Sequence, residues 1–183
     1  MRIADPYVDE LTSEASTTRR VLERVPEAHL NWRPHEKSMS LGQLALHVAT
    51  LPRQLTEFVT GDALDFSAAG NAPPAVARFP PCRGSDAVAG PGIRSPLLAA
   101  LNAREQAQSY LATLSDERAR ATWRLMAGGR ELFAAPRAAV LRSFLFNHWY
   151  HHRGQLLVYL RLLNVPVPSV YGPTADENPF ADA

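Results

Sequence analysis

The stretch PRAAVLRSFLFNHWYHHRGQLLVYLRLLN, residues 136–164, decides the fold of this chain. Apolar residues and two histidines recur in it at spacings of three and four, which places them on one face of an α-helix. Pro166 and Pro168 follow, and neither can continue a helix. We therefore predict a helix over 136–164, roughly 43 Å long at the α-helical rise per residue. Its inward face consists of Val140, Phe144, His148, His152, Leu156, Tyr159 and Leu163.

Three other segments show the same apolar spacing and predict three more helices. The first covers about 7–25. The second covers 40–61, where Ser40 begins a capping box, and Pro52 should kink this helix rather than end it. The third covers about 95–114, with a serine cap and a proline in its first turn.

Together the four helices predict an all-α fold, a four-helix bundle formed by residues 1–183 as a single domain. Segment 61–94 is proline-rich and has no sustained periodicity. We interpret it as a long crossover loop between the second and third helices, which lets these two run parallel. Before the last helix, TWRLMAGGRELF predicts a small irregular or hairpin insert around Gly128-Gly129.

Composition argues against several classes of protein. The 183 residues carry 19 basic and 18 acidic side chains, a net charge of +1, without a basic block. We expect no nucleic-acid partner, because phosphate contacts need a basic surplus. No stretch approaches the ~20 apolar residues of a membrane span, and the N-terminus lacks a signal-peptide core, so we expect no membrane partner and a cytoplasmic location. Cys82 is the only cysteine, so no intramolecular disulfide is possible, and its role stays open.

The candidate chemistry lies in the histidines. His148 and His152 are four residues apart, so their imidazoles lie one turn apart on the inward face and can bind one ion. His47 lies three residues after Leu44 and four before Leu51, which turns it toward the same interior. Helix axes in a bundle are about 8–10 Å apart, so the three side chains can meet at one divalent metal. Three protein ligands leave a coordination position open, as in catalytic sites.

The alternative interpretation is that these are hydrogen-bonded core histidines. His151 is the nearest competitor as a ligand, but it lies off the apolar stripe, and His29 and His35 lie in the linker after the first helix. Gln43 and Gln155, each within four residues of a candidate ligand, are positioned to orient an imidazole or simply to face solvent. Gly154 inside the last helix indicates close approach of another helix or a ligand, because glycine costs about 1 kcal/mol there.

The sequence resembles the DinB-like superfamily of bacterial proteins. The stretches that carry the likeness are WRPHEKSMSLGQLALHVA (32–49), NHWYHHRGQLLVYLRLLNVPVPS (147–169) and YGPTADE (171–177). The resemblance implies a bundle with a long crossover and a three-histidine site for nickel, zinc or a similar ion. The family's first histidine falls on His47 and its HxxxH pair on His148 and His152. It also implies a homodimer, and some relatives are thiol transferases acting with bacillithiol or mycothiol.

The leading functional hypothesis is a metal-dependent transferase that uses a low-molecular-weight thiol, because an open-coordinated cation lowers the pKa of a bound thiol. One alternative is a metal-dependent hydrolase, with Glu57 as a candidate base. Another is a non-catalytic metal- or small-ligand-binding protein of a stress response. We expect nickel or zinc, then iron, while the thiol and the small-molecule substrate stay open. Coordination needs neutral imidazoles, so metal affinity should fall as pH drops through roughly 6.

Overall fold

The structure is a computed structural model that describes residues 1–67, 92 and 94–181. Most of the predicted loop 61–94, including Cys82, lies outside the described residues. In chain order the elements are α1 (Asp5–Leu22), the 3-10 turn η1 (Glu27–His29), α2 (Leu41–Thr60), β1 (Ala63–Asp65), α3 (Arg94–Asn102), α4 (Glu105–Thr113), α5 (Asp116–Arg120), β2 (Thr122–Ala127), β3 (Arg130–Pro136), α6 (Arg137–Val140), the π-helical turn η2 (Leu141–Asn147) and α7 (His148–Leu162).

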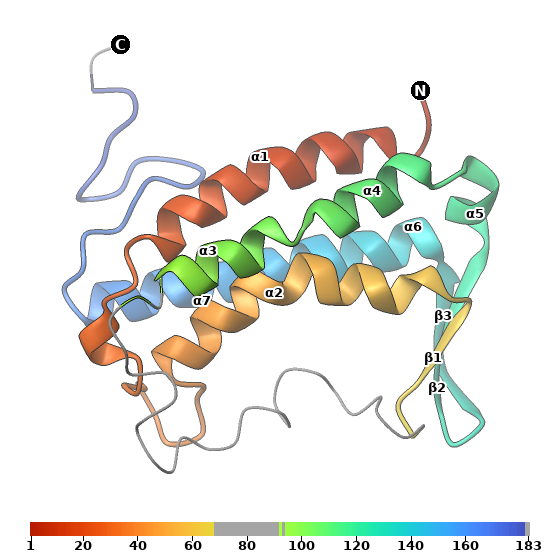
Figure 1. Ribbon diagram of the computed structural model, residues 1–183, viewed down its shortest axis with the longest axis horizontal. Coiled ribbons are helices and arrows are strands. Elements are labelled where there is room, and N and C mark those ends of the chain that lie inside the picture. Colours follow the sequence, from red (N-terminus) through yellow and green to blue (C-terminus); the bar gives the residue numbers. More distant parts are fainter. Residues whose placement is uncertain (68–91, 93, 182–183) are drawn as a thin grey trace.

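The long helices lie side by side. In Figure 1, α1 and the α6–α7 run point one way, and α2 and the α3–α4 run point the other. The second and third helical segments are therefore parallel, as predicted. The third is divided into α3 and α4 at Ala103 and Arg104. The side chains that its spacing predicts to be buried are all buried, namely Leu97, Leu101, Ala107, Leu111 and Leu114.

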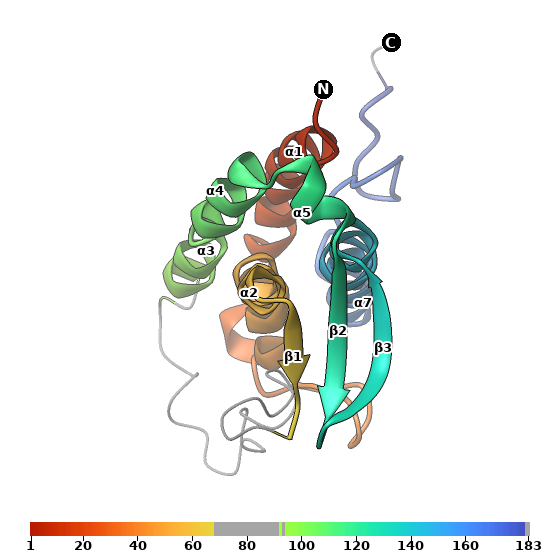
Figure 2. The ribbon, with the colours of Figure 1, turned by 90° about the vertical axis from the view of Figure 1, so that its right-hand side faces the viewer.

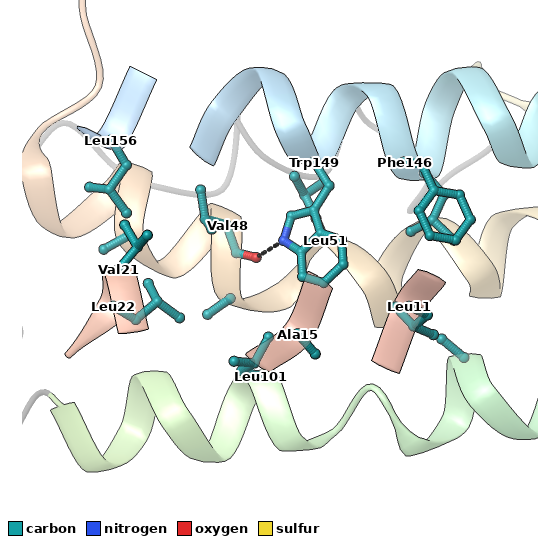
Figure 3. Packing of buried hydrophobic residues seen from close by; sticks show 14 of the residues in the cluster. Leu11, Ala15, Val21, Leu22, Val48, Leu51, Leu101, Phe146, Trp149 and Leu156 are labelled. Atoms are coloured by element: carbon teal, nitrogen blue, oxygen red, sulfur yellow. Dashed lines mark hydrogen bonds between the residues drawn. The ribbon is translucent and has the colours of Figure 1, made fainter. Parts of the chain in front are cut away.

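Helix α2 has both the predicted capping box and a bond that depends on its internal proline. Ser40 Oγ accepts a hydrogen bond from the Gln43 backbone N–H, and Gln43 Oε1 accepts one from the Ser40 N–H. The helix continues through Pro52, which has no N–H to donate to the carbonyl of Val48. The indole Nε1–H of Trp149 donates to that carbonyl over 2.9 Å (Figure 3). This bond joins α2 to α7 inside the core.

The predicted all-α class is wrong, because the described chain contains a three-stranded sheet in the order β1-β2-β3. Strands β2 and β3 form the hairpin expected around Gly128 and Gly129, whose φ angles of 57° and 78° suit a tight hairpin turn. Strand β1 pairs parallel with β2, Ala63 opposite Arg124. The sheet stands at one end of the helices, beside the end of α2 (Figures 1 and 2). Three residues of β1 carry no readable periodicity, so the sequence did not indicate this pairing.

Side chains from the sheet region cap the end of α2. The last carbonyls of a helix have no helical partners. Here the Phe58 carbonyl accepts a hydrogen bond from Trp123 Nε1 of β2 at 3.2 Å. The guanidinium of Arg137, fully buried at the start of α6, donates to the carbonyls of Val59, Gly61 and Arg118 and to the carboxylate of Asp62. These bonds fix the sheet against the helices.

The last helical run covers α6, η2 and α7 without a break, which confirms the predicted helix apart from its ends. Its buried face differs from the predicted stripe: Phe144, His148 and His152 are half-buried, and the neighbouring Trp149 and Arg153 are buried. The π-helical turn is one cause, because it changes the spacing of residues around the helix. Gly154 has nothing within 4 Å of where a Cβ would lie, so the close approach predicted there is absent among the described residues.

The apolar core lies between the helices, with Leu11 of α1, Leu51 of α2, Leu101 of α3, Phe146 of η2 and Trp149 of α7 meeting there (Figure 3). It holds the two helices that carry the candidate ligands, α2 and α7, in contact along their length. In the part of the chain that the structure describes, no helix has the length and apolar character that crossing a membrane requires.

Candidate metal centre

Three histidines from two helices meet beside the core. The ring of His47 on α2 lies 4.4 Å from that of His152 and 5.4 Å from that of His148, measured between centroids. The rings of His148 and His152, one turn apart on α7, are separated by 4.6 Å. One nitrogen from each ring lies within 4.8 Å of the other two. The nitrogens of imidazoles bound at about 2.0–2.1 Å around a tetrahedral ion lie roughly 3.4 Å from one another. Small side-chain rotations would therefore bring these three nitrogens to one ion.

Local backbone features place these side chains. His148 follows directly after the π-helical turn η2, a feature that is frequent at functional sites. His47 precedes Val48, whose carbonyl is bonded to Trp149, the residue after His148. The spacing of the two helices at the histidines is therefore fixed by a hydrogen bond one residue away on each helix.

Burial holds the imidazoles in the uncharged form. His47 is 3% exposed; this burial and, to a smaller extent, the neighbouring His152 and His148 lower its pKa to about 3. Burial also lowers the pKa of His152 to about 4, although its hydrogen bond with Gln155 opposes the shift. The pKa of His148 is lowered by burial and by the nearby His151. Neutral imidazole is the metal-binding form, so all three side chains are in their ligand form at neutral pH.

The donor set fits a divalent metal. The Nδ1 atom of His47 is buried and has no hydrogen-bond partner among the described residues, an arrangement that costs about 1–3 kcal/mol if nothing binds there. The Nε2 atoms of His148 and His152 face each other at 2.8 Å, so at least one lone pair already points into the space between the rings. Three imidazoles suit zinc, nickel, copper and iron, and the described residues could hold such an ion.

The two glutamines proposed as orienting residues differ. Gln155 Oε1 lies 2.8 Å from His152 Nδ1. When that nitrogen donates to the amide oxygen, the Nε2 lone pair of His152 faces the other two histidines, which is the orienting role predicted for Gln155. Gln43 is instead part of the capping box, where its side-chain oxygen accepts the Ser40 N–H. The role in orienting His47 that was considered for Gln43 is not seen, because the Ser40 N–H already occupies its side-chain oxygen.

The other residues considered from the sequence are exposed, although the ring of His151 lies 4.9 Å from that of His152. His151 is exposed and is not part of the three-histidine group. His29 and His35 are exposed in the linker between α1 and α2. Glu57, the candidate base for hydrolysis, is exposed on α2 and pairs with Arg53 at 2.6 Å.

A cavity of about 350 Å³ opens beside the three histidines. Its walls come from α2, β1 and the residues just after it, β2, η2 and α7. Aromatic side chains form much of the lining, namely Phe58, Phe66, Trp123 and Phe144. The three-stranded sheet, which the predicted helical bundle did not include, therefore forms one wall of this cavity.

Comparison with known proteins agrees with this fold. The family model of the DinB superfamily matches residues 10–156. The chain belongs to the DinB superfamily. The resemblance inferred from three short stretches of sequence is thereby confirmed.

Individual relatives are distant or matched over a short stretch. An uncharacterized protein of Bacillus subtilis (strain 168), YrdA, is 46% identical over 37 residues, which are 20% of this chain and 22% of YrdA. The chain thus matches about a fifth of that relative's length. The crystal structure of a DinB-like protein of Bacillus subtilis, YjoA, superposes with a TM-score of 0.59 at 20% identity, over 94% of this chain and 99% of YjoA. A DinB-like protein of Bacillus cereus gives 0.57 at 18% identity, over 90% and 95%. These two likenesses concern the fold.

Sequence reasoning missed the aromatic wall of the cavity. Phe58 shares the apolar spacing of the second helix, but no sequence pattern assigns Phe66 or Trp123 to a site. The hairpin segment carried one available signal, the alternation of Trp123 and Leu125, which directs both side chains to the same face of β2.

Proposed function

We propose that this DinB-superfamily protein binds one divalent metal ion through His47, His148 and His152 and uses it in a transferase reaction with a low-molecular-weight thiol. The observation that carries the proposal is a buried, uncharged histidine cluster with an unpaired nitrogen, opening on a cavity. The three histidines would hold the cation, which would supply a positive charge that lowers the pKa of a thiol and so favours thiolate at neutral pH.

The residues of the chain then position and shield the reactants. Gln155 keeps the Nε2 atom of His152 turned toward the other two histidines, and the apolar walls keep bulk water from the reacting sulfur. In the proposed reaction the thiol gives its proton to solvent and its sulfur forms a bond to an electrophilic carbon. The leaving group departs with its electron pair. Among the described lining residues none is a carboxylate, which favours thiol transfer over hydrolysis, because activating water usually needs such a base.

Metal content tests the first half of the proposal. Purified wild type should carry about one divalent ion per chain by elemental analysis, and His148→Ala should lose most of it. His151→Ala, which removes the exposed neighbour on the same helix, is the matched control and should keep the ion. Equal metal content in wild type and His148→Ala would overturn the site.

Turnover tests the second half. The metal-loaded protein is assayed with several cellular thiols, bacillithiol and mycothiol among them, against a panel of carbon electrophiles. Formation of the S–C product that depends on His148 supports the transferase. A ligand that binds tightly and is recovered unchanged, with no turnover for any pair, favours the alternative of a non-catalytic metal- or small-ligand-binding protein.

Several finer expectations belong to the same proposal: nickel or zinc as the ion, with iron next, a cytoplasmic location, residues 1–183 as a single domain, and a homodimer. For the dimer, α7 exposes Val158 and Leu162, at 57% and 56% of their surface, one turn apart on its outer face. Light scattering of the wild type and of Val158→Glu measures whether that face joins two copies.

A further inference from the structure

The lining of the cavity restricts what it can hold. Among the described residues that line it, the polar ones are the three histidines and Gln54, and none is aspartate, glutamate, lysine or arginine. Away from the histidines, a charged group moved from water into such a lining meets no side chain of opposite charge, and burying an unpaired charge is costly. The cavity volume of about 350 Å³ is at the small end of the roughly 300–1,000 Å³ seen for small-molecule sites. The lining therefore selects compact, uncharged molecules.

The aromatic part of the wall is held in place by its own contacts. Trp123 is 1% exposed and its indole N–H is fixed by the carbonyl of Phe58. Its ring meets Phe144 edge to face, with centroids 6.2 Å apart and ring planes at 81°. Phe133 of β3 supports Phe144 at 5.5 Å. Such a preformed wall favours a planar apolar ligand, because rings pack well against ring edges and faces and little side-chain freedom is lost on binding.

The histidines and the sheet lie toward opposite ends of the cavity. Along α2 the lining residues extend from His47 to Val59, about 18 Å at the α-helical rise. Along the last helical run they extend from His152 back to Phe144, and this run is antiparallel to α2. Gln54 lies between the ends, where its amide can pair with one polar atom of a ligand.

We propose that the cavity binds a compact, uncharged molecule with an aromatic or similarly planar apolar body, which lies against Trp123 and Phe144 with its reactive end at the histidines. The position of the reactive end rests on the proposed function. The uncharged, apolar class rests on the lining alone. Among electrophilic substrates, this selects those whose body is a neutral aromatic ring over those whose body carries a carboxylate or phosphate.

A matched pair of fluorescent probes tests the class. N-phenyl-1-naphthylamine is neutral, and 8-anilino-1-naphthalenesulfonate has the same ring framework with one sulfonate. We expect the neutral probe to bind chelator-treated wild type with at least about tenfold lower Kd, because the sulfonate meets no side chain of opposite charge in the lining. Leu125→Arg, or Gln54→Arg at a half-buried position, should weaken the neutral probe and favour the sulfonate. Leu132→Arg, on the adjacent strand outside the lining, is the control and should change neither affinity.

The proposal is overturned if the neutral probe does not bind wild type, if the sulfonate binds as tightly, or if both lining variants leave the preference unchanged. Titrating chelator-treated and metal-loaded samples of known metal content separates this result from the proposed function. If wild type carries no metal and still prefers the neutral probe, the proposed metal function is wrong and the proposed ligand class stands. If wild type carries one metal per chain and shows no preference, the ligand class is wrong and the metal function stands.

Discussion

The indole of Trp149 and the carbonyl of Val48 are joined by a 2.9 Å hydrogen bond between α7 and α2. The carbonyl is available because Pro52, four residues further along, has no N–H for it. Each bonded residue directly follows a histidine of the candidate centre, Val48 after His47 and Trp149 after His148. A proline that removes a helical bond thus provides the acceptor that sets the two helices at the site.

Trp149→Phe should lower zinc or nickel affinity about tenfold, because the two helices lose the bond beside the ligands. It should also lower the free energy of unfolding by about 1–3 kcal/mol. Trp123→Phe is the matched control, since it too removes an indole bond to an α2 carbonyl, but at the far end of that helix. Metal titration and urea unfolding of both variants decide the matter; equal losses of affinity would contradict the positioning role.

Replacing the two glutamines should have separate effects. Gln155→Ala should weaken metal binding by about 10–100-fold, because His152 loses the contact that orients it. Gln43→Ala should leave metal affinity unchanged and cost about 1 kcal/mol of stability through the capping box. Calorimetric metal titration with denaturant unfolding measures both. A loss of affinity in Gln43→Ala alone would show that the roles are reversed.

The stability of the metal-free protein should depend on pH below 6.5. The pKa values of His47 and His152 are about 3 and about 4 in the folded chain, against 6.5 for an ordinary histidine. Between these values the unfolded chain binds more protons, so the free energy of unfolding falls as pH drops from 6.5 toward 4. Urea unfolding of chelator-treated protein from pH 7.5 to 4.5 measures the slope. His47→Leu should show a shallower slope.

The same pKa shifts correct the pH range expected for metal release. The sequence, with ordinary histidines, predicts a loss of affinity near pH 6. Because burial lowers all three pKa values, protons compete with the metal only at lower pH, and the folded protein should hold its ion down to about pH 5. Dialysis at fixed pH followed by elemental analysis measures retention. Release near pH 6, while circular dichroism shows the fold intact, would contradict this account.

Arg137→Met should destabilise the fold by about 3 kcal/mol or more. The change leaves carbonyls at the end of α2 without their donor and removes one of two guanidinium partners of the exposed Asp62 carboxylate. Arg124→Met removes an exposed pair with Glu131 and should cost less than about 1 kcal/mol. Thermal unfolding of the two variants compares them directly.

The helices and the meeting of the candidate ligands were predictable because each helix repeats its apolar spacing over several turns. That repetition placed His47 and the HxxxH pair on facing helices, and the three rings do meet. The parallel pairing of β1 with β2 was not predictable, since three residues have no period and their partner lies far along the chain. The buried face of the last run was misplaced because the π-helical turn changes its phase and because Arg153 is buried, with its guanidinium paired to Glu14 at 2.6 Å. No sequence pattern marks either feature.

The pairing of β1 with β2 has a consequence for synthesis. A ribosome completes α2 and β1 well before it makes β2 and α7, so the newly made first part of the chain contains one candidate ligand, His47, and only part of the cavity wall. Neither the candidate metal centre nor the cavity is complete until α7 has been made and packs against α2. An unfinished or truncated chain should therefore lack both.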